Sequence, residues 1–123
     1  MEINNKVLYI EDNPSNILLM KVIFRNFKGF ELSIKETAEE GLEWVYTDIP
    51  DLILMDKDLP LMSGLEATHI LKNNVNFKNI PIILLTADND VNIEKHALDV
   101  GCNDVEFKPF DIVNLKTKIM SYF

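Results

Sequence analysis

The sequence predicts an α/β protein in which helices cover both faces of a parallel five-stranded sheet. Two short and uninterrupted apolar runs, 52–55 and 82–85, are typical of strands that are buried on both faces. Stretches with helical spacing or helix-capping residues follow the apolar runs, so strand and helix alternate five times. Such alternation favours a parallel sheet joined by right-handed crossovers. The length of 123 residues suits one domain, residues 1–123, with one core.

The first strand–helix pair begins at the N-terminus. Residues 6–10 form a short apolar run, and Asn13 and Pro14 are typical of a helix N-cap and first helical position. Leu18 and Val22 lie on the outward face of this helix. Four other apolar residues share the opposite face and are expected in the core: Met20, Ile23, Phe24 and Phe27.

The second pair is less apolar. Residues 30–35 include charged side chains, and we expect a strand at the edge of the sheet. The run 37–40, Thr-Ala-Glu-Glu, has the form of a capping box. It predicts a helix that runs to about Tyr46, with Leu42 and Val45 facing the core.

The third and fourth pairs contain the apolar runs already described. Residues 51–56 and 82–86 are predicted strands, followed by helices over 64–74 and 90–100, the second of which ends before Gly101. The residues of the 64–74 helix expected in the core are Leu65, Ile70 and Leu71.

The last pair completes the domain. Residues 104–107 form the final predicted strand, and Asp111 is the expected N-cap of the last helix. Cys102, just before the strand, is expected to be a small core residue. The residues of the last helix expected to face inward are Ile112, Leu115 and Ile119.

Composition and charge exclude several functional classes. A net charge of −8 argues against direct binding of nucleic acid, which requires a basic surface. No apolar run approaches the roughly 20 residues that span a bilayer, and residues 1–5 do not resemble a signal peptide. A single cysteine excludes an internal disulfide and fits a reducing compartment, so we expect a cytoplasmic protein without membrane insertion.

Reactive side chains stand at the carboxyl ends of four predicted strands. These ends share one edge of a parallel sheet, so the side chains are expected to meet there. Carboxylates crowded together favour a hard cation such as Mg²⁺, and a neighbouring lysine and hydroxyl suit a phosphoryl group. The residues concerned are Glu11, Asp12, Asp56, Thr86 and Lys108.

Asp56 follows the most apolar strand, where it could be a nucleophile, a metal ligand or a helix cap. A charge is costly inside a core, so we expect Asp56 at the rim, solvated or coordinated. Taken singly, each of the reactive residues also has an ordinary structural explanation. Their joint placement at strand ends is the observation that favours a functional site.

Five motifs occur in an order and spacing that are similar to those of a known family. They are 11–14 (Glu-Asp-Asn-Pro), 52–56 (Leu-Ile-Leu-Met-Asp), 59–64 (Leu-Pro-Leu-Met-Ser-Gly), 81–87 (Pro-Ile-Ile-Leu-Leu-Thr-Ala) and 108–110 (Lys-Pro-Phe). Along essentially its whole length the chain resembles the receiver domain of two-component response regulators. The resemblance implies a flavodoxin-like fold with strand order 2-1-3-4-5.

The resemblance also assigns roles. Asp56 would accept a phosphoryl group from the phosphohistidine of a histidine kinase or phosphotransfer protein. Lys108 would pair with the phosphoryl oxygens, Thr86 would hydrogen-bond them, and Ala87 and Asp58 would border the phosphoryl site. The implied ligands of Mg²⁺ are Glu11, Asp12, Asp56 and the backbone carbonyl of Asp58.

Partner binding is implied as well. In similar receivers the first helix, here with Leu18 and Val22, docks the phosphodonor beside the active-site loops. The family further suggests a cis peptide bond between Lys108 and Pro109. The chain would act on itself, by catalysing its own phosphorylation and dephosphorylation, so it is not expected to be an enzyme with a separate substrate. The downstream partner, and whether the domain stands alone, stay open.

Two other functional classes share part of this pattern. The Asp-x-Asp of residues 56–58 resembles that of haloacid-dehalogenase-type phosphatases, which also use a pair of acidic residues. In those phosphatases the Asp-x-Asp lies near the N-terminus and the acidic pair comes last, whereas here the acidic pair, Glu11 and Asp12, comes first. Residues 69–72 (His-Ile-Leu-Lys) faintly resemble a histidine phosphotransfer motif. Those modules are all-helical, so His69 is expected to be an exposed helix residue.

Overall fold

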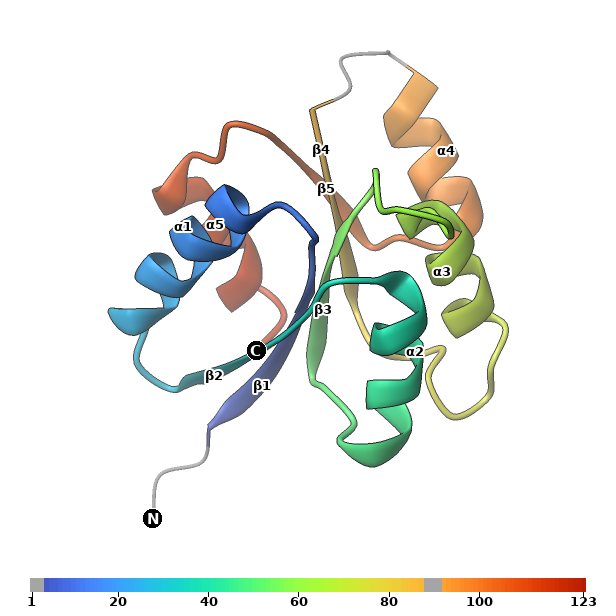
Figure 1. Ribbon diagram of the computed structural model, residues 1–123, viewed down its shortest axis with the longest axis horizontal. Coiled ribbons are helices and arrows are strands. Elements are labelled where there is room, and N and C mark those ends of the chain that lie inside the picture. The colour runs from blue at the N-terminus through green and yellow to red at the C-terminus, as the bar shows by residue number, and fades with distance from the viewer. Residues whose placement is uncertain (1–3, 88–91) are drawn as a thin grey trace.

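A parallel five-stranded sheet forms the centre of the molecule (Figure 1). The computed structural model describes residues 4–87 and 92–123. Within these residues the strands are β1 (Asn5–Ile10), β2 (Phe30–Lys35), β3 (Leu52–Asp56), β4 (Ile82–Thr86) and β5 (Asp104–Phe107). The helices are α1 (Pro14–Arg25), α2 (Ala38–Thr47), α3 (Gly64–Lys72), α4 (Asn92–Val100) and α5 (Ile112–Met120). The order β2-β1-β3-β4-β5 confirms the predicted α/β fold and places β2 at an edge.

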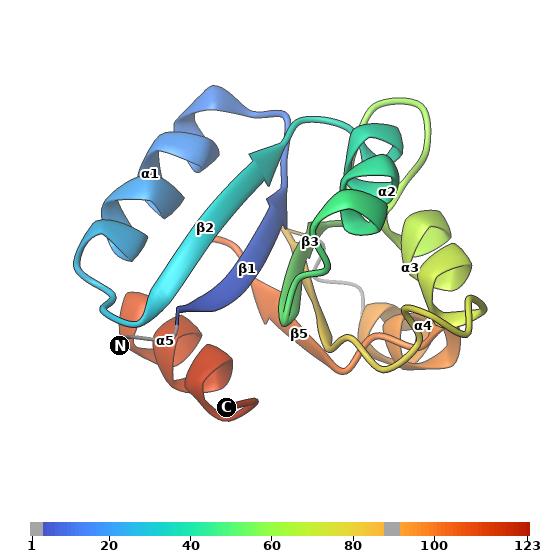
Figure 2. The same ribbon diagram turned by 90° about the horizontal axis from the view of Figure 1, so that it is seen from below.

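The helices form a layer on each face of the sheet (Figure 2). Helices α1 and α5 cover one face, and α2, α3 and α4 cover the other. Strands β3 and β4 are buried along their whole length, as their unbroken apolar sequences predict. The core therefore has two parts, one on each side of the sheet, and the carboxyl ends of the strands emerge between the helix layers.

Side-chain caps fix the beginnings of α1 and α2. The Asn13 side chain accepts hydrogen bonds from the backbone N–H groups of Ser15 and Asn16, at 2.9 and 3.2 Å. The Thr37 hydroxyl accepts one from the N–H of Glu40 at 3.1 Å. These bonds satisfy N–H groups that have no partner inside the helix, which confirms both predicted starts.

Most predicted core positions are buried, but two are wrong. Ile70 is 45% exposed and Ile112 is 44% exposed. In α3 the buried stripe instead runs through Ala67, Thr68 and Leu71, which leaves Ile70 at its border. Ile112 is the first residue of α5, before the helix reaches the sheet. The helix α3 also ends at Lys72, two residues earlier than predicted.

The remaining expectations concern single residues. Cys102 is buried and free, and His69 is exposed, as predicted. Gly101 has φ 106° and follows the end of α4, a conformation that glycine adopts without strain. The predicted start of that helix at Asp90 lies outside the described residues. Among the described residues, no helix is both long and apolar enough to cross a bilayer.

Candidate functional site

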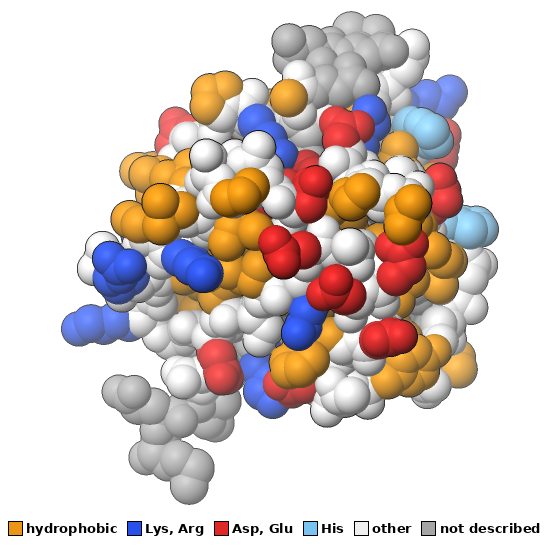
Figure 3. All heavy atoms as spheres, viewed as in Figure 1, with side chains coloured by type: hydrophobic (Ala, Val, Ile, Leu, Met, Phe, Trp, Pro, Cys, Tyr) orange, Lys and Arg blue, Asp and Glu red, His pale blue; other side chains and the backbone are white. Residues whose placement is uncertain are grey.

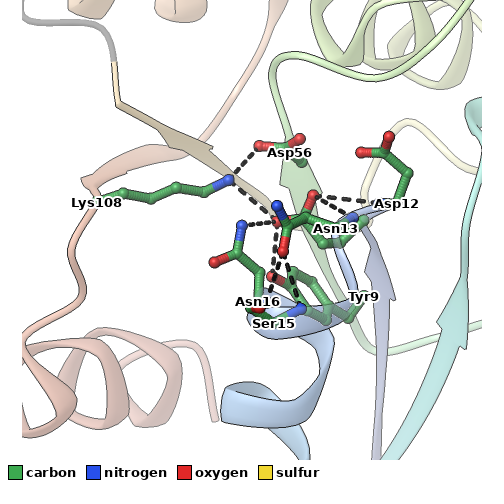
Figure 4. A network of polar contacts seen from close by, with 8 residues as sticks. Tyr9, Asp12, Asn13, Ser15, Asn16, Asp56 and Lys108 are labelled. Carbon is green, nitrogen blue, oxygen red and sulfur yellow. Dashed lines mark hydrogen bonds and ion pairs between the residues drawn. The ribbon is translucent and has the colours of Figure 1, made fainter.

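Three strand ends bring a lysine and two carboxylates into direct contact. Glu11 follows β1, Asp56 ends β3 and Lys108 follows β5. The Lys108 Nζ lies 2.7 Å from Asp56 Oδ1 and 3.0 Å from Glu11 Oε1 (Figure 4). Residues distant in the chain therefore meet at the edge of the sheet, where the sequence predicted that they would.

Asp56 is buried, which corrects the expectation of a solvated rim position, whereas the alternative expectation of coordination stays a prediction. Only 3% of the residue is exposed, because β3 is enclosed by β1 and β4 and by helices on both faces. Burial raises the pKa of Asp56 to about 6, and the charge of Glu11 acts in the same direction. Lys108 opposes both effects, and its ammonium group is the partner that lets this carboxylate ionise at neutral pH.

For Glu11 and Lys108, unlike Asp56, the mutual interaction outweighs the effect of burial on the pKa. Burial alone would raise the pKa of Glu11, but the hydrogen bond and charge of Lys108 outweigh it and the pKa lies below its usual range. Burial likewise works against the charge of Lys108, yet the bonds to Asp56 and Glu11 raise its pKa. At neutral pH the site therefore contains an ammonium group between two carboxylates.

A third carboxylate completes an acidic cluster. Ligand oxygens of Glu11, Asp12 and Asp56 lie within 4.8 Å of one another. Asp12 is exposed, and in Figure 4 its side chain lies on the other side of Asp56 from Lys108. Hard oxygen ligands, with one of them open to solvent, fit Mg²⁺, which retains several of its waters when protein binds it. The donor set is therefore suited to the predicted metal.

Glu11 accepts hydrogen bonds from more groups than its motif predicts. Its Oε1 accepts hydrogen bonds from the Tyr9 hydroxyl at 3.2 Å and from Asn16 Nδ2 at 2.9 Å, besides the bond from Lys108. Its Oε2 accepts from the backbone N–H groups of Asp12 and Asn13, at 3.2 and 3.4 Å. A polar tyrosine inside an apolar strand sequence was the one signal that could have indicated this network.

The hydroxyl and the lysine predicted beside the phosphoryl site are adjacent in the sheet. Thr86 ends β4, is buried, and pairs in register with Phe107, the residue before Lys108. The Lys108 N–H donates to the Thr86 carbonyl at 2.8 Å. Ala87 follows and is exposed, and the Lys108–Pro109 bond is cis, as the resemblance suggested. Thr86, Ala87 and Lys108 therefore lie together at the carboxyl ends of β4 and β5.

The loop between β3 and α3 follows Asp56 directly and returns to it at Gly64. The side chain of Asp58 is 71% exposed and lies 3.5 Å from Lys57 Nζ. Gly64 returns the chain against β3 so closely that a Cβ there would collide with the Asp56 carbonyl. Leu61, in between, has φ 65° and is 92% exposed, a strained backbone with an apolar side chain in solvent. Sequence reasoning did not single out this leucine.

Comparison with known proteins gives a consistent result. The family model described as the response regulator receiver domain matches residues 7–120. The polar-differentiation response regulator DivK of Brucella ovis is 34% identical over 116 residues, which are 94% of each chain. Hybrid signal transduction histidine kinase D of Dictyostelium discoideum is 35% identical over 97% of this chain, although the chain spans only 8% of that kinase.

A solved structure shows the same architecture. The receiver domain of the sensor histidine kinase PA1611 from Pseudomonas aeruginosa superposes with a TM-score of 0.87. It is 28% identical in sequence, with 97% of each chain covered. That structure is described as having a magnesium ion coordinated in the active site cleft.

Proposed function

The chain belongs to the response regulator receiver domain family of two-component signalling, and from this premise we propose that Asp56 accepts a phosphoryl group in a Mg²⁺-dependent reaction. The donor is the phosphohistidine of a histidine kinase or of a phosphotransfer protein. The observation that carries the proposal is the contact of Lys108 with Asp56 and Glu11 beside the acidic cluster. A buried free cysteine further supports a reducing, cytoplasmic location.

The chemistry is an in-line displacement at phosphorus. A carboxylate oxygen of Asp56 attacks, the P–N bond of the phosphohistidine breaks, and the imidazole takes the electron pair of that bond. An acyl phosphate results. There is little covalent work for the protein beyond the nucleophile, so positioning and charge stabilisation dominate. The chain changes only itself and has no separate substrate to turn over.

Other residues of the site have distinct roles in this step. The Lys108 ammonium group, already 2.7 Å from Asp56, pairs with an oxygen of the incoming phosphoryl group. The Thr86 hydroxyl donates to another oxygen, and the small, exposed Ala87 leaves room for the donor. Asp58, two residues beyond Asp56 and exposed to solvent, would border the same space.

The acidic cluster provides the metal site. Bound Mg²⁺ would neutralise part of the negative charge shared by the carboxylates and the transferring phosphoryl group. Its protein ligands would be Glu11, Asp12, Asp56 and the backbone carbonyl of Asp58. The magnesium ion in the Pseudomonas receiver domain, at 28% identity, supports this assignment.

Labelling with a small phosphodonor tests the proposal. Incubation with acetyl phosphate and Mg²⁺ is expected to add the mass of one phosphoryl group to the intact chain. Chelation of the metal with EDTA before the donor is added should slow the rate of labelling roughly tenfold or more. The charge stabilisation that the metal provides corresponds to at least about 1.4 kcal/mol of barrier. Labelling that is as fast in EDTA as in Mg²⁺ would refute the metal dependence.

The outward face of α1 is the proposed docking surface for the phosphodonor protein. Leu18 and Val22, one turn apart, are 61% and 42% exposed, and the neighbouring Leu19 is 38% exposed. Figure 3 shows hydrophobic side chains exposed on the side of the molecule where Figure 1 places α1. These exposed apolar side chains of α1 form a surface that an apolar partner surface can cover.

Replacing Leu18 with aspartate should separate docking from chemistry. The donor is a purified, histidine-phosphorylated kinase or phosphotransfer domain that labels the parent chain. We expect transfer from this donor to Leu18→Asp to be about tenfold slower, because a buried leucine contact is worth about 1.5 kcal/mol or more. Labelling by acetyl phosphate should stay within twofold. Leu98→Asp is the matched control, since Leu98 is 60% exposed but lies on α4. Equal slowing with both donors would rule out the docking role.

A further inference from the structure

We propose that Tyr9 and Asn16 are positioning residues that hold the Glu11 carboxylate in the orientation in which it serves the metal site. The proposal rests on the function proposed above and deepens it, because it assigns the magnesium affinity of this chain partly to two neutral side chains. Neither belongs to the motifs by which the site was recognised. Both donate a hydrogen bond to Glu11 Oε1, at 3.2 and 2.9 Å (Figure 4).

Glu11 needs such support more than its neighbours do. A glutamate side chain has three rotatable bonds, and fixing them costs up to about 2 kcal/mol of conformational free energy. Glu11 is 1% exposed, so an unheld carboxylate would also lack water as a partner. Donors that are already in place remove this cost before the metal arrives.

Lys108 cannot fill this role throughout the reaction. It bridges Glu11 and Asp56 in the structure, and in the proposed chemistry it turns to the phosphoryl oxygens. Its positive charge also opposes a cation in the same cluster. Tyr9 and Asn16 are neutral, so they can orient Glu11 without cancelling the negative charge that attracts the metal.

The fold sets the position of both donors independently of Lys108. Tyr9 lies within β1, in register with Ile34 of β2 and Leu54 of β3, and is completely buried. From this position inside the sheet its hydroxyl donates the hydrogen bond to Glu11 Oε1. Asn16 stands in the first turn of α1, where the Asn13 cap receives its N–H.

The test is the dissociation constant for Mg²⁺, measured by isothermal titration calorimetry without any phosphodonor. Tyr9→Phe keeps the ring and removes only the hydroxyl, and Asn16→Ala removes the amide. We expect each variant to bind Mg²⁺ about tenfold more weakly, the usual effect of losing a group that orients a metal ligand. Tyr46→Phe is the matched control: that exposed hydroxyl accepts from Asn74 Nδ2 at 3.2 Å, away from the site, and its loss should leave the affinity unchanged.

A purely structural role gives a different pattern. It would lower the free energy of unfolding measured in EDTA and leave the affinity of the folded protein for Mg²⁺ unchanged. Parent-like or tighter binding in folded Tyr9→Phe and Asn16→Ala would therefore overturn the inference while leaving the proposed function intact. If Tyr9→Phe does not fold, the affinity of Asn16→Ala decides alone. Failure of the parent chain to bind Mg²⁺ would overturn both the inference and the metal part of the proposed function.

Discussion

Replacing Asp56 with alanine is expected to abolish labelling by acetyl phosphate, with a loss of roughly a thousandfold or more, as for removal of the nucleophile from an enzyme. The mass shift of one phosphoryl group should be absent under conditions that label the parent chain completely. The reason is geometric as well as chemical. Asp56 is the carboxylate that ends the central strand β3, and Lys108, the proposed partner of the phosphoryl oxygens, lies 2.7 Å from it.

The residue before the same strand offers the control. Asp51 lies just before the amino end of β3, where its side chain accepts a hydrogen bond from the Lys6 N–H at 2.8 Å. Asp51→Ala removes the same chemical group and should be labelled at the parent rate. Full labelling of Asp56→Ala would show that another residue is the acceptor, and His69 on α3 would then be examined first.

Substitution of Lys108 by alanine should slow labelling by roughly a hundredfold, the effect of losing one preorganised donor to a developing charge. The variant also leaves two buried carboxylates, Glu11 and Asp56, without their shared ammonium partner. Because the substitution removes the positive charge of the ammonium group from the acidic cluster, the affinity of the variant for Mg²⁺ should not fall. A slower reaction at undiminished metal affinity is the signature that separates the proposed role of the lysine from general damage to the site.

Lys118 is a close match for this experiment. It lies in α5 and pairs with two carboxylates, Asp104 at 3.2 Å and Glu106 at 2.9 Å, so Lys118→Ala breaks an equivalent network outside the site. Its labelling rate should stay within about threefold of the parent, about 0.7 kcal/mol of barrier. Comparable losses in the two lysine variants would mean that stability, not phosphoryl transfer, explains the effect of Lys108.

The elements that sequence could predict are those with strong local signals. Buried strands β3 and β4 have unbroken apolar sequences, and the caps Asn13 and Thr37 mark helix starts that the structure retains. The prediction that Ile70 faces the core was wrong. In a helix as short as α3, the packing against the sheet decides which apolar residues are buried, and the sequence pattern alone does not show it. Ile112 was misplaced because hydrophobicity alone does not show where a helix first reaches the core.

The site was predictable in its members but not in its environment. That strand ends converge follows from a parallel sheet, so the meeting of Glu11, Asp56 and Lys108 could be expected. Burial of Asp56 could not, because it depends on how closely the flanking strands and helices enclose it. The bonds of Tyr9 and Asn16 to Glu11 were missed for the same reason: they join a strand, a loop and a helix through side-chain geometry that spacing does not encode.

Chemical mapping of the acceptor tests the central claim most directly. The parent chain would be phosphorylated with acetyl phosphate and Mg²⁺, reduced with borohydride, digested and sequenced by mass spectrometry. Borohydride converts the carbonyl of an aspartyl phosphate to an alcohol, which leaves homoserine in place of aspartate. We predict homoserine at position 56 alone, and none when EDTA replaces Mg²⁺. Homoserine at another aspartate, or a stable phosphoryl group on His69 with position 56 unchanged, would contradict the account.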